Sequence, residues 1–180
     1  VRGESTQLVN VKVVSDGYPL RGKIRINRDD GKGEVNALSI LAPGTMWVAP
    51  RVLDMLGVKV GDALELGAAR LTIDAVVSQE SDNALDFMNV APRVIINQRD
   101  LVATELLGVG SRVSYRLLLA GETDTIANFR SWATPKLVAG ERIEGVRDAR
   151  PEVRTMLERA GRFLSLCSLM AAILSAVAAA

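Results

Sequence analysis

The first hundred residues contain short runs in which apolar and polar side chains alternate, with the two-residue period of a half-buried β-strand. Residues 7–14 show it most clearly, because the valines at 9, 11 and 13 fall on one face and Lys12 falls on the other. Glycine-containing turns separate these runs, a pattern typical of a small, barrel-like β unit. The strands predicted in this region cover residues 7–14, 23–27, 34–39, 46–48, 63–66, 71–77 and 94–97, of which 71–77 also alternates and 94–97 is a short apolar run.

Two short helices are predicted within this β-rich region. The first covers residues 50–56, since Pro50 suits the start of a helix and Gly57 suits its C-terminal cap. The second lies within residues 98–107. Residues 29–33 (DDGKG) match neither the EF-hand nor the P-loop pattern, so we interpret them as a turn rather than a calcium or phosphate site.

The pattern changes after residue 112 to a single strand–helix–strand unit. This unit lacks the glycine-rich turn of a nucleotide-binding fold. Its helix is expected to be capped by Thr123 or Asp124, and Phe129 and Trp132 are interpreted as core anchors rather than as a ligand platform. The predicted elements are a strand over 113–120, a helix over 124–134 and a strand over 141–146.

Residues 151–180 predict one long helix that leaves a soluble domain and enters a membrane. Pro151 suits its first turn, and residues 163–180 carry no charge, which is close to the lower limit for crossing a bilayer. A buried helix of a soluble protein is the alternative. Only Gly161 interrupts the helical pattern, so the helix could act as a stiff coupling lever, with Leu157 on its apolar face.

The charges before the uncharged run leave the topology open. Five arginines precede it, a bias usually found on the cytoplasmic side of a membrane. Large domains, however, cross membranes largely regardless of charge. The arginines are at positions 147, 150, 154, 159 and 162.

Composition excludes several functional classes. The chain has 22 basic and 21 acidic residues without a basic block, so it lacks the footprint of a nucleic-acid-binding protein. It contains no histidine, which excludes a Ser-His-Asp triad, a Cys-His pair and a histidine-containing zinc site. The single cysteine, Cys167, lies in the uncharged run. We therefore predict a protein that is not an enzyme, with no catalytic, cofactor or metal site.

One acidic segment, residues 79–90, is the candidate for a partner surface. It brings together Glu80, Asp82 and Asp86, which could bind a cation or act in acid–base chemistry. No base, nucleophile or oxyanion element accompanies them in the sequence. We interpret the segment as an exposed loop whose carboxylates could contact a partner.

Residues 56–66 (LGVKVGDALEL), followed by the predicted strand over 71–77, resemble part of the periplasmic core domain of the MacB/FtsX-type ABC transporter permease superfamily. Further stretches are most similar to the first periplasmic domain of its YbbP branch, and the similarity covers nearly the whole chain. These are residues 9–26 (VNVKVVSDGYPLRGKIRI), 91–97 (APRVIIN), 110–121 (GSRVSYRLLLAG), 140–154 and 158–164.

The resemblance implies an α+β fold in which a small β-rich lobe is inserted in a βαβ porter-like half. The expected organisation is a lobe over 1–112, the porter half over 113–150 and a stalk over 151–180 that continues into a transmembrane helix. Family members carry another strand and helix before the position of Val1. The porter sheet here is therefore expected to lack a partner strand, and a dimer formed through that edge could be artefactual.

The resemblance also implies a location and a mechanism. The domain would face the periplasm from a bacterial inner membrane, and a cytoplasmic ABC ATPase subunit (YbbA-like) would move it by mechanotransmission. The branch is associated with hydrophobic or lipid-related cargo and with a periplasmic esterase as a possible partner. Two alternatives stay open: a membrane-tethered binding module, favoured by an apolar groove beside the helix, and a membrane-anchored hydrolase, which the missing histidines disfavour.

Overall fold

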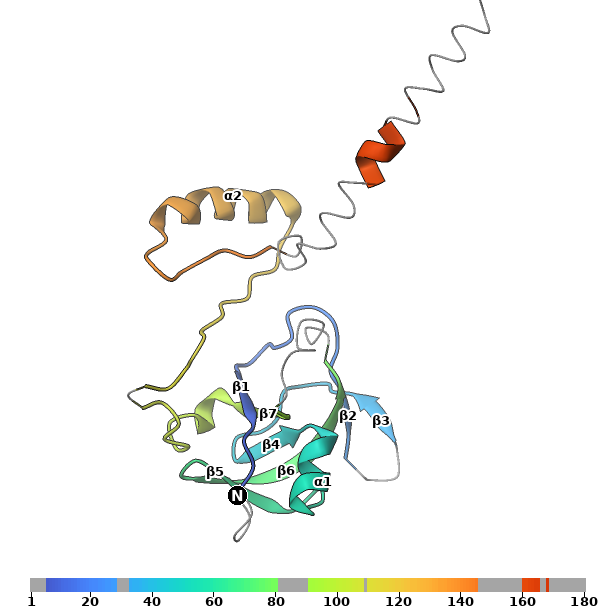
Figure 1. Cartoon of the computed structure of the whole chain (residues 1–180), viewed down its shortest axis with the longest axis vertical. Coiled ribbons are helices and arrows are strands. Elements are labelled where there is room, and N and C mark those ends of the chain that lie inside the picture. Colours follow the sequence, from blue (N-terminus) through green and yellow to red (C-terminus); the bar gives the residue numbers. More distant parts are fainter. Residues whose placement is uncertain are drawn as a thin grey trace, which may run out of the picture. The chain divides into compact units, whose positions relative to one another are not determined.

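The computed structural model describes residues 6–28, 33–80, 91–108, 110–145, 160–165 and 168. The fold is mixed α+β, with one sheet and few helices (Figure 1). The chain divides into two compact units between Ala120 and Gly121, and each unit is described here by itself. The α+β class expected from the sequence is therefore confirmed at this level.

The first unit is built on a seven-stranded sheet with the order β1-β7-β4-β6-β2-β3, while β5 pairs with β6. Each predicted strand is present: β1, β2 and β3 are shorter than expected, β4, β6 and β7 are longer, and β5 has the expected bounds. The strands are β1 (Asn10–Val14), β2 (Arg25–Asn27), β3 (Glu34–Asn36), β4 (Thr45–Val48), β5 (Ala63–Leu66), β6 (Ala69–Gln79) and β7 (Arg93–Asn97).

Strand β6 organises the sheet because it pairs with three neighbours along its eleven residues. Its beginning pairs with β5, its middle runs parallel to β4, and its end runs antiparallel to β2. The register with β4 shifts by one residue at Asp74, and the register with β2 shifts at Ser78. Such bulges bend a strand and increase its twist. A bent β6 can therefore pair with neighbouring strands that have different orientations.

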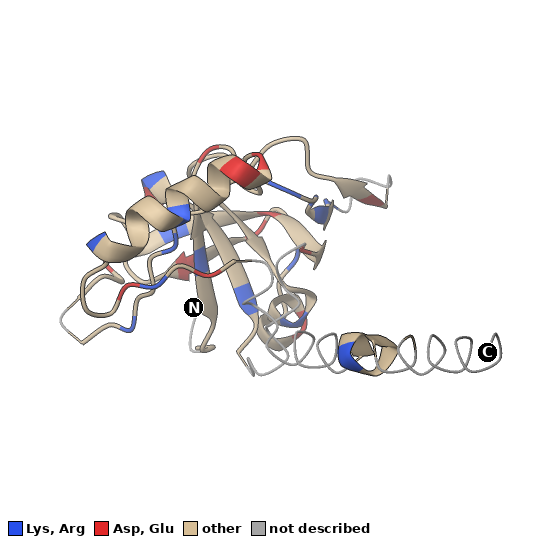
Figure 2. Ribbon diagram, turned by 90° about the horizontal axis from the view of Figure 1, so that it is seen from above, with Lys and Arg blue, Asp and Glu red and all other residues tan. Residues whose placement is uncertain are grey.

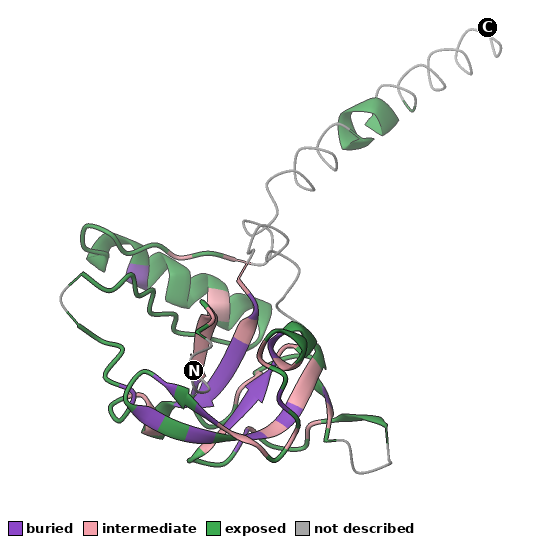
Figure 3. Cartoon of the chain, turned by 60° about the horizontal axis from the view of Figure 1, so that its bottom comes forward, coloured by how far each residue is buried: buried purple, intermediate pink, exposed green. Residues whose placement is uncertain are grey.

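Alternate positions of the central strands fill two apolar clusters. In β4, Met46 and Val48 belong to the first cluster, which helix α1 (Pro50–Leu56) joins through Val52. Trp47 lies between them in sequence and belongs to the second cluster, together with Ile95. All five of these side chains are almost completely buried, and Figure 3 shows the buried residues concentrated in the central strands. Because both faces of β4 and β7 are buried, these strands read in the sequence as short continuous apolar runs.

Helix α1 is confirmed from Pro50 to Leu56, with Gly57 at its C-terminal cap. Gly57 has a φ of 59°, the left-handed conformation that glycine adopts without steric cost. The second predicted helix is reduced to the 3₁₀ turn η2 (Gln98–Asp100), followed by further turns up to Glu105.

The second unit contains helix α2 (Thr123–Ala133) and the 3₁₀ turn η3 (Thr134–Lys136). The helix is confirmed, but its N-cap is Glu122, without a side-chain capping bond, instead of Thr123 or Asp124. Figure 2 shows acidic residues at the start of the helix and basic residues toward its end. This arrangement complements the helix dipole.

The strands predicted over 113–120 and 141–146 are wrong for the residues that the structure describes there. Residues 110–120 and 141–145 have no strand assignment, and Tyr115 and Leu117 are 82% and 83% exposed. Alternation produces a strand only where a neighbouring strand supplies backbone hydrogen bonds and a core covers the apolar face. Neither is present for this stretch in the described part of the chain.

Across the described part of the chain, we find no helix with the length and hydropathy that a bilayer crossing requires. The predicted membrane helix falls largely on residues outside that part, so it stays a prediction.

Candidate functional site

A buried carboxylate directly after β6 forms the centre of the candidate site. The Glu80 side chain is 1% exposed. It accepts a hydrogen bond from the Tyr18 hydroxyl at 2.5 Å, and it forms ion pairs with Lys12 and with Arg93, the latter at 2.7 Å. A buried charge is stable only when it is paired and hydrogen-bonded. Glu80 meets this requirement through three separate parts of the chain. We call these four residues the Glu80 cluster.

The strands position the cations of the Glu80 cluster by simple alternation. Lys12 is two residues before Val14 on β1, and Arg93 is two residues before Ile95 on β7, so each shares a face with a residue of the second apolar cluster. The Lys12 ammonium also lies 4.5 Å from the centre of the Tyr18 ring, a cation–π contact. The Glu80 cluster therefore lies beside the second apolar cluster, against which Tyr18 packs.

The interpretation of Glu80 as an exposed residue of a loop is wrong, because its side chain is buried and paired. Asp82 and Asp86 lie outside the described residues, so their part in a partner surface stays a prediction. The sequence indicated part of this cluster, since alternation placed Lys12 on the face of its strand opposite the valines. Nothing in the spacing of Lys12, Glu80 and Arg93 indicated that they meet.

The chemistry of the Glu80 cluster suits holding elements together. One carboxylate receives a cation from β1 and another from β7, and both cations are about one-fifth exposed. Within the ranges that the structure describes, no group of three or more Asp, Glu, Cys or His side chains could hold a metal ion. We therefore read the cluster as a structural crosslink between strands.

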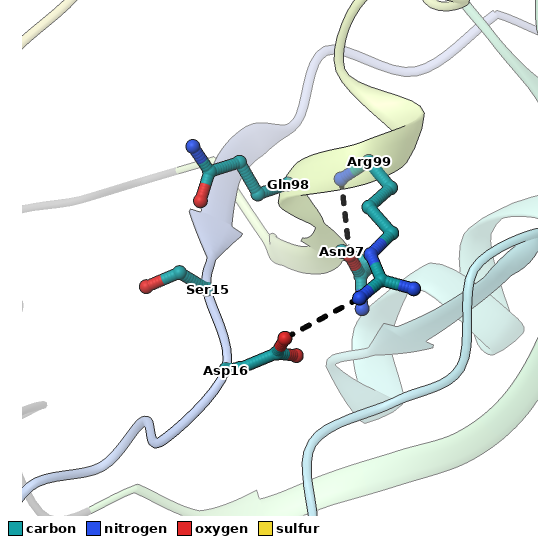
Figure 4. A pocket seen from close by; sticks show the side chains of 5 residues that line it. All are labelled: Ser15, Asp16, Asn97, Gln98 and Arg99. Atoms are coloured by element: carbon teal, nitrogen blue, oxygen red, sulfur yellow. Dashed lines mark hydrogen bonds and ion pairs between the residues drawn. The ribbon is translucent and has the colours of Figure 1, made fainter.

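A polar pocket of about 410 Å³ opens where the parallel strands β1 and β7 end (Figure 4). The Asn97 side chain is buried there. Its Oδ1 accepts a hydrogen bond from the Arg99 backbone N–H at 3.0 Å, and its Nδ2 donates one to the Leu41 backbone carbonyl at 2.9 Å. Asp16 and Arg99 face each other at 3.5 Å, and both are largely exposed. The lining residues are Ser15, Asp16, Asn97, Gln98 and Arg99. All five lining residues have polar side chains.

Residues 98–104 follow β7, and we call them the outgoing segment. Hydrogen bonds fasten this segment to the lobe at two points. Both carboxylate oxygens of Asp100 accept from the Gly44 N–H at 2.9 Å. Four residues later the Thr104 carbonyl accepts from the Ala68 N–H at 2.9 Å, and Thr104 is completely buried. These bonds hold the outgoing segment against the turn before β4 and the β5–β6 hairpin. Sequence reasoning missed them, because no local pattern indicates such long-range contacts.

Asp74, at the bulge of β6, joins the second apolar cluster to the surface. It accepts from the Trp47 indole N–H at 2.7 Å and from Arg28 at 3.0 and 3.3 Å. Burial is the largest single influence and would raise the pKa of Asp74. The hydrogen bonds from Arg28 and Trp47, together with the Arg28 charge, outweigh it and lower the pKa below its usual value of 3.8.

We expect Asp74→Asn to lower the free energy of unfolding by about 1 kcal/mol at pH 7. A carboxyl with a lowered folded-state pKa stabilises the fold above its unfolded-state value, and this stabilisation disappears as the pH falls through the folded-state value. The variant should therefore lose part of the acid sensitivity of the wild type below about pH 4. Urea denaturation at pH 7 and pH 3 measures both effects, with exposed Asp54→Asn as the control. An unchanged pH dependence in the Asp74 variant would contradict the assignment.

The aromatic residues of α2 do not form a core in the described structure. Phe129 and Trp132 are 36% and 60% exposed, so their interpretation as core anchors is wrong. Their ring centres lie 5.8 Å apart, and the Lys136 ammonium lies 4.7 Å from the Trp132 ring. A helix becomes buried only where another element covers its apolar face. Among the described residues of this unit, no second helix or strand does so.

Of the predicted coupling residues, only Gly161 is described. It lies in a helical stretch over residues 160–165, where its carbonyl accepts from the Ser165 hydroxyl at 2.9 Å. A Cβ at Gly161 would meet nothing within 4 Å. Pro151 and Leu157 lie outside the described residues.

Comparison with known proteins finds one informative relative. Over 178 residues, or 99% of this chain, the sequence is 31% identical to YbbP of Escherichia coli K12, an uncharacterized ABC transporter permease. The chain spans 21% of the length of that protein. No protein-family model and no solved structure matches. The resemblance inferred from the sequence is thereby confirmed.

Proposed function

Because this chain is homologous over nearly its whole length to an ABC transporter permease, we propose that it is the extracytoplasmic part of such a permease and couples ATP hydrolysis to work outside the cytoplasm. An ABC permease acts with a cytoplasmic ATPase and is associated with the membrane. The proposal adds that this domain faces the periplasm and transmits force without itself passing cargo. Hydrophobic or lipid-related material, with a periplasmic esterase or lipid-related protein as partner, is the cargo class we propose.

The similarity to YbbP carries this proposal, and two features of the chain support it. The β-rich unit contains two well-packed apolar clusters, and its outgoing segment is fastened by Asp100 and Thr104, so displacement of that segment would carry the lobe with it. The sequence beyond residue 150 predicts a helix that continues into an uncharged run. A stiff helix that pulls on the chain leaving a packed lobe can transmit movement to it.

The test uses the full permease purified with its ATPase and reconstituted in lipid. A donor dye attached at Leu38→Cys, which is fully exposed, reports movement relative to an acceptor on the ATPase. Cys167 and every other cysteine of the complex outside the two labelling positions are replaced by serine. We expect ATP to change the energy transfer in the wild type. Leu157→Pro should abolish this change while ATP hydrolysis persists, because an interior proline costs roughly 3 kcal/mol and kinks a helix.

Two matched variants complete this experiment. Gly161→Ala should retain the ATP-driven change, because a methyl group there meets open space. Glu158→Gln, on the charged face predicted from the sequence, should be nearly silent. A full response in Leu157→Pro, or its loss in Gly161→Ala, would disprove the lever. If ATP produces no movement in the wild type, the alternative of a membrane-tethered binding module is favoured.

A further inference from the structure

The first and last strands of the β-rich lobe are direct neighbours, and they run parallel. β1 pairs with β7 over five residues, from Asn10 opposite Arg93 to Val14 opposite Asn97 (Figure 1). The chain therefore enters β1 at its N-terminal end and leaves β7 at its C-terminal end, from which residues 98–104 run on against the lobe. These two points lie at opposite ends of one strand pair.

This arrangement decides how the lobe responds to tension. A pull between the incoming and outgoing chain acts along the two strands in opposite directions, so it slides one strand past the other. The hydrogen bonds of a parallel ladder are evenly spaced, and in such a sliding geometry they must all fail together. A pull at the same end of both strands would instead break them one after another.

The Glu80 cluster reinforces this strand pair. Lys12 belongs to β1 and Arg93 to β7, and both are bound by the same buried carboxylate. Sliding β1 along β7 would separate Lys12 from Glu80 and leave a buried charge incompletely paired, which is strongly unfavourable. The outgoing segment is fastened as well, through Asp100 to Gly44 and through Thr104 to Ala68.

We propose that the β1–β7 pair, locked by Glu80, is a mechanical clamp that keeps the lobe folded when tension acts between its incoming and outgoing chain. The clamp rests on the proposed function only for the source of the tension, which would be the ATP-driven movement of the permease. Its mechanical resistance is a property of this chain alone.

Single-molecule force spectroscopy of the whole chain tests the clamp with two pulling directions. Both use a handle at Leu8→Cys, in a Cys167→Ser background. In the first, the second handle at Gln98→Cys loads the strand pair by sliding. In the second, the handle at Ala91→Cys pulls the same pair open from one end. Leu8 and Gln98 are exposed and Ala91 is half-buried, and none of the three belongs to the Glu80 cluster.

We expect a clearly higher unfolding force for Leu8–Gln98 than for Leu8–Ala91 at the same pulling speed. In the sliding geometry, Glu80→Gln should raise the unfolding rate at constant force by about tenfold or more, because it removes the buried ion pairs that resist sliding. The unfolding rate is the quantity to measure, since it governs forced unfolding. Exposed Asp54→Asn should leave this rate unchanged.

Equal forces in the two directions would overturn the clamp, and this comparison needs no variant of Glu80. An unchanged unfolding rate in a folded Glu80→Gln variant would show that Glu80 does not contribute to the clamp. The ATP-driven energy transfer of the full permease is measured separately, so a failure of the clamp and a failure of the proposed function can be distinguished.

Discussion

Replacing Glu80 with glutamine is expected to lower the free energy of unfolding by about 3–5 kcal/mol, the usual cost of breaking a buried ion pair by removing one partner. Glutamine keeps the size of the side chain but loses its charge, so the cations of Lys12 and Arg93 would face each other without the carboxylate that binds both. The Tyr18 hydroxyl would also exchange a charged acceptor for a neutral one.

Urea denaturation followed by circular dichroism measures this change, and the sheet offers a matched control. Glu34 pairs with Arg25 at 3.6 Å, but both side chains are nearly half exposed. Exposed pairs contribute about 0–1 kcal/mol, so Glu34→Gln should change stability little. A similar, small effect of both substitutions would show that Glu80 does not hold the strands together.

The β-rich lobe could be predicted from the sequence because its signals are local. Val11 and Val13 of β1 pack against the first apolar cluster, and buried residues of β6 alternate with more exposed ones, so a two-residue period is visible in the sequence. Helix α1 has a proline at its start and a glycine at its end, and both residues match the observed conformation. In each case the residues that indicate the element are neighbours in the sequence.

The prediction failed where structure depends on distant partners. Residues 113–120 alternate as β1 does, but no described strand pairs with them, so they remain exposed. Glu80 looked like one acid among several in a polar segment, and its burial depends on Lys12 and Arg93. Lys12 and Glu80 are brought together only by the order of strands in the sheet. Alternation and spacing describe a single strand, and they do not state which strand lies beside it.

The second large effect is expected at Gly67, where the β5–β6 hairpin meets the outgoing segment. A Cβ at this position would lie 1.9 Å from the Thr104 carbonyl oxygen and 3.1 Å from Leu106 Cδ2. The oxygen cannot easily withdraw, because it accepts the Ala68 N–H at 2.9 Å and Thr104 is completely buried. Gly67→Ala must therefore displace backbone and break one of the two fastenings of the outgoing segment.

We expect Gly67→Ala to lower the free energy of unfolding by about 3 kcal/mol or more, since overpacking costs about 1–3 kcal/mol and a left-handed non-glycine residue about 1–2 kcal/mol. Gly57→Ala separates these two contributions. Gly57 has nearly the same φ as Gly67, 59° against 60°, but its Cβ would meet nothing within 4 Å. The Gly57 variant should therefore show the conformational cost alone. If urea denaturation shows that the two variants lose the same free energy of unfolding, the close contact between the hairpin and Thr104 does not exist in solution.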